Sequence, residues 1–186
     1  MLFSAYRRIM LITGLSLLLV NAAYSYTLIG STVWSGNGHL YQVYGGSSTW
    51  GEAAAFASTV SVPGFHNGYL ATVHSEAENN VITGLLTLAA WLGGYQPPGE
   101  LDPNANWQWV KGEPWTYTHW YPGQPNDALG PGSEQYLVIY TNGMWHDYPD
   151  GTRPSFVVEL NPVPDPASIV GLGVGMAGLF LRRRKR

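Results

Sequence analysis

The chain has 186 residues, which is enough for one ordinary domain with additional segments at its ends. Eleven acidic residues lie between Glu52 and Glu159, and only two basic residues, Lys111 and Arg153, accompany them. This acidic region excludes nucleic acid and anionic membranes as its partners, because both bind basic surfaces. Eight tryptophans and 23 glycines suit short strands and turns, and without cysteine the domain must be held together by packing alone.

Residues 1–25 have the three parts of a secretory signal peptide. Arg7 and Arg8 precede an apolar run from Ile9 to Val20, and small residues end at Ser25. An uncleaved membrane anchor is the alternative, but the run is shorter than the roughly 20 residues that span a bilayer. We therefore expect export and cleavage.

The first predicted elements of the domain are a strand and a helix. Residues 39–44 have the composition of a strand, and the glycine pair that follows predicts a turn at residues 45–47. Thr49 and Glu52 have the spacing of a capping box, which predicts a helix through Ala53–Ala57.

A loop and a second helix follow. The glycines at its two ends predict a loop over residues 64–68. Ser75 and Glu78 have the spacing of a second capping box, and apolar residues recur at helical spacing to about residue 88. These apolar residues are Ala77, Val81, Ile82, Leu85 and Leu86.

Strands predominate in the rest of the domain. Short apolar or alternating runs predict strands at residues 90–94, 107–110 and 155–160, with a polar loop over residues 96–106. Two early helices and several late strands indicate an α+β architecture.

Asn142 and Gly143 mark a hairpin. They lie between Tyr136–Tyr140 and Met144–Trp145, and an Asn-Gly pair in this setting predicts a two-residue turn. Folding the chain back there can bring together side-chain oxygens that are far apart in the sequence. Such oxygens are the ligands that a hard cation such as calcium requires. The candidates are Gln124, Asn126, Asp127, Glu134 and Asp147.

Residues 163–186 have the order of parts of a sorting signal. A proline-rich start precedes a short apolar run from Ile169 to Leu181 and a basic end, which would stop translocation and stay in the cytoplasm. The segment resembles the PEP-CTERM signal of Gram-negative bacteria, with Asp165 in place of that family's glutamate. The resemblance implies an exosortase-type processing enzyme and a transient inner-membrane anchor, followed by release to the cell surface or extracellular matrix. A permanent single-span anchor is the alternative.

Residues 36–160 resemble the C-type lectin-like domain. The resemblance implies an α+β fold of two helices with short antiparallel sheets and a long loop region. It also implies that Ala57 with Val158, and Tyr136 with a residue near position 150, occupy places where the family has disulfides. The matching motifs follow the family's order: His39-Leu-Tyr41, Trp50-x-Glu52-Ala53, Leu70-Ala-Thr72, Ser75-x-x-Glu78-Asn79, Trp91-Leu-Gly93, Trp107-x-Trp109, Gly112-Glu-Pro114, Trp120, Gln124-Pro-Asn126, Glu134, Trp145-His-Asp147 and Phe156-Val-Val-Glu159.

The same resemblance implies a calcium ion that also accepts sugar hydroxyl groups. Gln124 and Asn126 would supply amide oxygens, and the proline between them would be cis. Glu134 and Asp147 would supply carboxylates, and Asp127 would neutralise charge nearby. Because Gln-Pro-Asn mixes the family's Glu-Pro-Asn and Gln-Pro-Asp patterns, the preferred sugar stays open.

His146 stands where the family has asparagine. In one interpretation its side chain points away and the other residues still bind calcium. In a second it recruits a softer metal such as zinc, since imidazole suits such ions. In a third the site is degenerate and binds protein or no known ligand.

Aromatic and histidine residues near the motif have simpler interpretations. Trp115 and Tyr117 are candidates for contact with a sugar, whereas Trp145 is expected in the core. An enzyme could recruit His119, His146 and Glu134 as acid and base, but the chain has no nucleophile motif or Gly-rich phosphate loop. The histidines expected at the surface or at caps are His39, His66 and His74.

These features predict an exported, surface-sorted, non-enzymatic module. Its expected partner is a carbohydrate or exopolysaccharide, bound with calcium where the site is intact. The alternative is a structural or adhesive surface protein that uses the same scaffold to bind protein without metal.

Overall fold

The computed structural model describes residues 25–151 and 153–164. The predicted signal peptide, apart from Ser25, and the predicted sorting signal from residue 165 onward lie outside the described residues, and both stay predictions. Within these two ranges, no helix has both the length and the apolar character needed to cross a membrane.

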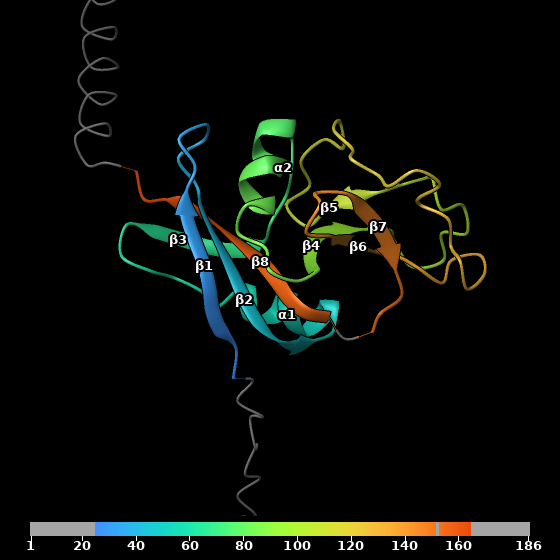
Figure 1. The fold of residues 1–186 in the computed structure, drawn as a ribbon, viewed down its shortest axis with the longest axis horizontal. Coiled ribbons are helices and arrows are strands. Elements are labelled where there is room, and N and C mark those ends of the chain that lie inside the picture. Colours follow the sequence, from blue (N-terminus) through green and yellow to red (C-terminus); the bar gives the residue numbers. More distant parts are fainter. Residues whose placement is uncertain (1–24, 152, 165–186) are drawn as a thin grey trace, which may run out of the picture.

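Two helices pack on one sheet of eight strands in the described chain (Figure 1). The central strand order is β1-β2-β8-β4-β6-β7, with β3 paired to β8 and β5 paired to β4. The predicted α+β class is confirmed, but the sheet is mixed because β4 and β8 run parallel. The elements are β1 (Thr27–Val33), β2 (Leu40–Ser48), α1 (Trp50–Ala57), β3 (Phe65–Leu70), α2 (Glu76–Thr83), β4 (Ala90–Tyr95), β5 (Gln108–Trp109), β6 (Tyr136–Ile139), β7 (Trp145–Tyr148) and β8 (Arg153–Pro162).

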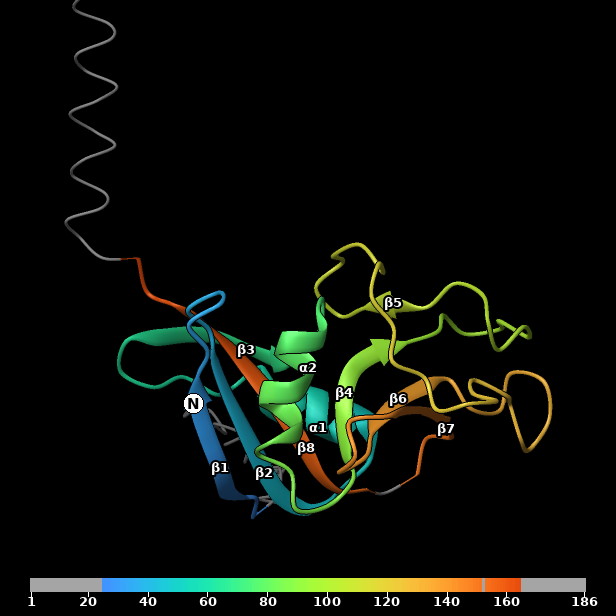
Figure 2. The same ribbon diagram turned by 45° about the horizontal axis from the view of Figure 1, so that its top comes forward.

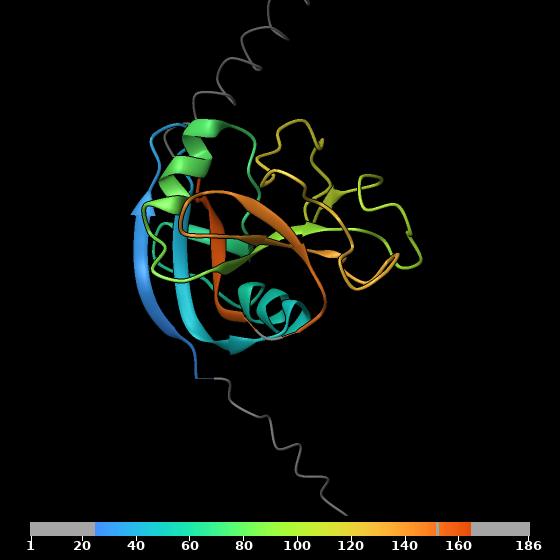
Figure 3. The same cartoon turned by 45° about the vertical axis from the view of Figure 1, so that its right-hand side comes forward.

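The strand β8 separates two apolar cores. Its side chains alternate, so Phe156 and Val158 face the core that includes Ala53 and Ala57 of α1, whereas Val157 faces the core that includes Ile82 of α2. The two helices therefore cover opposite faces of the sheet, and Figures 1 and 3 show them on either side of β8. Ala57 and Val158, the positions of an expected disulfide in the family, share the first core.

The two predicted capping boxes differ in the structure. At α1 the box is complete, because Thr49 Oγ1 accepts the Glu52 N–H at 3.2 Å and a Glu52 carboxylate oxygen accepts the Thr49 N–H at 2.9 Å. At α2 only Ser75 makes its expected bond, since the Glu78 carboxylate accepts the N–H of the residue before the cap. The helix ends at Thr83 rather than near residue 88.

Two predictions of a turn and a loop were wrong. The expected turn at residues 45–47 is part of β2, which continues to Ser48 beside β8. The expected loop at residues 64–68 is mostly β3, whose pairing with β8 comes from a distant part of the chain. The strand β1 precedes the predicted domain start at Gly36 and pairs with β2 at the edge of the sheet.

The hairpin of β6 and β7 is confirmed, but its turn has three residues instead of two. Gly143 N–H donates to the Tyr140 carbonyl at 2.8 Å, and Tyr140 N–H donates to the Met144 carbonyl at 3.0 Å. Gly143 has φ 81°, the left-handed conformation that ends a three-residue loop of this kind. Asn79 of α2 holds the hairpin, because its side chain donates to the Gly143 carbonyl and accepts from Trp145 Nε1.

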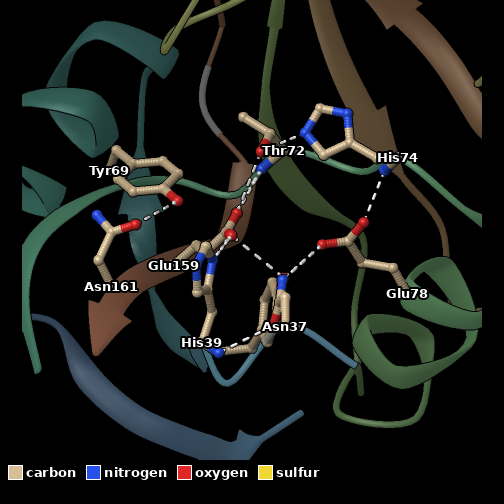
Figure 4. A network of polar contacts seen from close by, with 9 residues as sticks. Asn37, His39, Tyr69, Thr72, His74, Glu78, Glu159 and Asn161 are labelled. Atoms are coloured by element: carbon tan, nitrogen blue, oxygen red, sulfur yellow. Dashed lines mark hydrogen bonds and ion pairs between the residues drawn. The ribbon is translucent and has the colours of Figure 1, made fainter. Parts of the chain in front are cut away.

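A network of polar side chains is buried between β2, β8 and α2 (Figure 4). Glu159, only 2% exposed, accepts from Thr72 N–H at 3.0 Å and pairs with His39 Nδ1 at 2.5 Å. Glu78, also 2% exposed, accepts from His74 N–H at 2.7 Å, and the Tyr41 hydroxyl bonds both carboxylates. The expectation that His39 is a simple surface residue was wrong, because its ring provides a donor to a buried carboxylate.

Candidate functional site

The loop region between β4 and β6 extends away from β1 and carries the predicted ligand motif (Figures 1 and 2). Within it, Gln124 N–H donates to the Tyr121 carbonyl at 2.8 Å and closes a β-turn. Gly123, the third residue of the turn, has φ 91°, which glycine adopts without strain. The Gln124–Pro125 bond is cis, as the resemblance implied.

Asp147 of β7 anchors this loop. One of its carboxylate oxygens, Oδ2, accepts the N–H groups of Asn126 at 2.9 Å and Asp127 at 2.8 Å. The residues of β7 alternate, so Trp145 and Asp147 are buried while His146 is half-buried. The hairpin thus brings Asp147 to the Gln-Pro-Asn motif, as the sequence predicted.

The carboxylates of Asp127 and Glu134 close the loop on itself. Asp127 accepts the N–H groups of Gly132 at 2.7 Å and Glu134 at 2.9 Å. Glu134 in turn accepts the N–H of Ala128 at 2.7 Å. Asp127, a candidate ligand that was expected to neutralise charge, therefore also determines the shape of the loop.

Two oxygen atoms of the predicted ligands are buried without a hydrogen-bond partner. They are Gln124 Oε1 and Asp147 Oδ1. Buried polar atoms are usually satisfied, and amide and carboxylate oxygens are ligands that calcium accepts. These atoms fit a hard cation in chemical type, although the described residues contain no group of three or more His, Cys, Asp or Glu side chains arranged to hold a metal ion.

Burial raises the pKa values of the two carboxyl groups that are predicted to bind the cation. It raises the pKa of Asp147, against the effect of backbone N–H donors, and it raises the pKa of Glu134. Neighbouring negative charge acts in the same direction on both groups. A bound divalent cation would reverse this effect, because it favours the ionised carboxylates.

His146 lies between two tyrosines. Its ring stacks on Tyr121, with centroids 5.1 Å apart and planes at 21°, and contacts Tyr140 with centroids 4.5 Å apart. Burial lowers the pKa of His146, which favours the neutral imidazole. The three interpretations of His146 stay predictions.

Trp115 and Tyr117 pack against the core rather than standing free in solvent. Trp115 lies 4.3 Å from Trp109 and 5.9 Å from Trp145 between ring centroids. Tyr117 packs edge-on against Trp145, and its hydroxyl lies 3.1 Å from His119 Nδ1. Their role as sugar contacts stays a prediction, whereas the expected core position of Trp145 is confirmed.

Each of the side chains that an enzyme would recruit has a different partner. His119 bonds Tyr117, Glu134 bonds the loop backbone, and His146 contacts the two tyrosines.

Sequence reasoning missed Tyr121 and Asn79 as parts of this region. The signal for Tyr121 was its position directly before the Pro-Gly turn. Asn79 gave no local signal, because its partners lie on a hairpin more than sixty residues away.

Comparison with known proteins identifies a matching family model, described as "Lectin C-type domain", over residues 47–158. Rat lithostathine is 30% identical over 121 residues, which cover 60% of this chain and 66% of that protein. The chain spans 21% to 66% of the length of three curated relatives that it matches.

Two solved structures show the same fold. The carbohydrate-recognition domain of cow CD23, studied in the presence of a GlcNAc2Man3 oligosaccharide, has a TM-score of 0.56 at 24% identity and covers 68% of this chain and 90% of its own. A calcium-independent type II antifreeze protein has a TM-score of 0.59 at 22% identity and covers 76% of this chain and 99% of its own.

Proposed function

Because the chain belongs to the C-type lectin domain family, whose members are generally non-enzymatic carbohydrate binders, we propose that it binds saccharides through a calcium ion held near Asp147. Gln124 and Asn126 would supply amide oxygens to the ion, and Glu134 and Asp147 would supply carboxylate oxygens. Asp127 would keep the loop in shape through its bonds to Gly132 and Glu134.

The proposal rests on the two unpartnered oxygens, Gln124 Oε1 and Asp147 Oδ1. Leaving a buried acceptor unsatisfied costs about 1–3 kcal/mol, so the loop gains most from a ligand that satisfies both. Asn126 is exposed beside them, which leaves its side chain accessible to solvent and to a ligand. Calcium, when bound, supplies open coordination positions that accept the hydroxyl groups of a sugar.

We further propose that the module acts outside the cell on polysaccharide. The support is the signal-peptide pattern of residues 1–25 and the sorting-signal pattern of residues 163–186. Processing by an exosortase-type enzyme, a transient inner-membrane anchor and final placement at the surface of a Gram-negative bacterium belong to the same proposal.

A metal-independent surface protein that binds another protein is the second candidate. It is favoured by the hydrogen bonds that already occupy Asp127 and Glu134, since backbone N–H groups hold the loop without an ion. One solved protein of the same fold, a type II antifreeze protein, is itself described as calcium-independent.

Thermal unfolding of the full chain separates the two candidates. Calcium that binds only the folded state must raise the melting temperature, by an amount that grows with its concentration. We expect this rise with calcium, its reversal by a chelator, and a smaller effect of magnesium. Equal melting in calcium and chelator would sink the calcium-dependent proposal.

A glycan array, probed with and without chelator, then tests the ligand class. We expect binding that chelator abolishes. Glycan binding that survives chelator would retain the lectin function and remove the ion from it, whereas an array without binding would favour the protein-binding candidate.

A further inference from the structure

Gln96 holds the loop at residues 97–106 through its side-chain amide. It directly follows β4 and is 2% exposed. Its Nε2 donates to the carbonyls of Ala105 at 2.6 Å, Asp102 at 2.8 Å and Pro103 at 3.3 Å. Because three backbone carbonyls face one buried amide group, the path of this loop is fixed from the end of a core strand.

Gln135 and Gly132 join that loop to the ligand loop, residues 124–135 (Figure 2). Gln96 N–H donates to the Gln135 carbonyl at 2.9 Å, and Gln135 Nε2 donates to the Glu100 carbonyl at 3.2 Å. The backbone of Gly132 lies against the same carbonyl, since an added Cβ would stand 2.6 Å from the Glu100 oxygen. We call these contacts, together with those of the Gln96 side chain, the amide clip.

The amide clip reaches two carboxylates of the proposed site through short stretches of backbone. Gln135 directly follows Glu134, and Gly132 N–H donates to the Asp127 carboxylate at 2.7 Å. Glu134 N–H donates to the other oxygen of the Asp127 carboxylate at 2.9 Å. A displacement of residues 132–135 away from the amide clip would therefore move both carboxylates.

We propose that Gln96 and Gln135 are positioning residues that hold the ligand loop in its calcium-binding shape before an ion arrives. The inference rests on the proposed function and adds that calcium binds a preformed loop instead of ordering one. A side-chain amide is neutral, so the amide clip depends neither on protonation nor on an ion of its own. A loop that is already ordered spares calcium the entropy cost of ordering it, which raises the affinity.

Hydrogen exchange of the full chain in chelator tests whether the amide clip acts on the ligand loop or on the whole fold. Gln135→Ala removes the donor, and Gln135→Glu keeps the size of the side chain but has no donor at neutral pH. In both variants we expect the amide protons of Ala128 and Glu134 to exchange about tenfold faster, while those of β2 and β8 keep their wild-type rates. Gln108→Ala, at an exposed glutamine of β5, is the control and should change neither set.

A further variant separates the two loops without changing a glutamine. Gly132→Ala places a Cβ against the Glu100 carbonyl and should also speed exchange in the ligand loop. Because Gly132 has φ 72°, alanine is strained there in any case, and the matched control is Gly112→Ala. Gly112 has φ 74°, and an added Cβ there would meet no atom within 4 Å.

Calcium titration of the same proteins connects the amide clip to the ion. When only a fraction of the molecules has the loop in its binding shape, the apparent Kd rises by the inverse of that fraction. We therefore expect Gln135→Ala to bind calcium about tenfold more weakly than the wild type, and bound calcium to return its exchange to the wild-type rate.

The outcomes separate this inference from the proposed function. If the wild type binds calcium and Gln135→Ala matches it in exchange and affinity, the inference is overturned while the proposed function stands. The inference also fails if Gln135→Glu behaves as the wild type, if Gly132→Ala matches Gly112→Ala, or if exchange in β2 and β8 rises as much as in the ligand loop. If the wild type does not respond to calcium, both are overturned.

Discussion

Two groups of buried side-chain oxygens in this domain differ in whether the protein supplies their hydrogen bonds. In the buried network, every carboxylate oxygen of Glu78 and Glu159 accepts a hydrogen bond from the protein. In the loop region, Asp147 Oδ1 and Gln124 Oε1 accept none. The network is complete without a ligand, whereas the loop is not, so similar chemistry supports structure in one place and binding in the other.

The largest expected effect comes from breaking the network. Glu159→Ala leaves the Thr72 N–H and the His39 ring without their acceptor in a buried site, which should lower the free energy of unfolding by about 3–5 kcal/mol. Denaturant unfolding of the full chain in chelator measures this loss. A loss below about 1 kcal/mol would show that the network is not structural.

The second-largest expected effect comes from a substitution that should abolish calcium binding by the loop while keeping the loop's shape. Asp147→Asn retains an oxygen that can accept from Asn126 and Asp127, but it lacks the charge that calcium needs. We expect unfolding in chelator to change little and the calcium-dependent stabilisation, about 2.7 kcal/mol at 100 times Kd, to disappear. Asp102→Asn is the control, because Asp102 also accepts a backbone N–H in another loop. Full calcium stabilisation in Asp147→Asn would remove Asp147 from the proposed site.

A smaller effect tests whether the two regions are independent. Asn79 follows Glu78 in α2 and bonds the hairpin that carries Asp147, so Asn79→Ala should cost about 2 kcal/mol through two buried hydrogen bonds. Asn80→Ala, at an exposed neighbouring position, should change the free energy of unfolding by less than about 0.5 kcal/mol. If Asn79→Ala also weakens calcium binding, the network helix and the ligand loop are coupled.

The smallest expected effect is a dependence of the free energy of unfolding on pH. The hydrogen bond to Glu159 raises the pKa of His39 above that of the unfolded chain. The resulting stability is fully present below the unfolded pKa of about 6.5 and is lost as pH rises through the folded value. We expect His39→Phe to flatten this slope in unfolding experiments between pH 6 and pH 9, and an unchanged slope would assign it to another group.

The sequence predicted the parts of the fold that depend on local chemistry. The capping box at Thr49, the hairpin at Gly143 and the core position of Trp145 follow from neighbouring residues, and they were found. The strands β1 and β3 were missed, because β1 is an edge strand with little alternation in burial and β3 depends on pairing with β8.

The candidate site also has features that the sequence predicted and features that it did not. Family resemblance supplied the cis peptide at Pro125, and the hairpin brought Asp147 to the loop as expected. The stacking of His146 between Tyr121 and Tyr140 was not predictable, since it depends on how the loop passes β7. The pairing of His39 with the buried Glu159 likewise joins residues 120 positions apart.

The order of strands also determines how the domain responds to tension. Since β2 is antiparallel to both of its neighbours, β1 and β8 run in the same direction, and the start of β1 and the end of β8 lie at opposite ends of the sheet (Figure 1). A pulling force between Thr27 and Pro162 acts along the strands, perpendicular to the hydrogen bonds that join them. The bonds of β2 then share the load in shear instead of opening one after another, which is the mechanically resistant arrangement of a sheet.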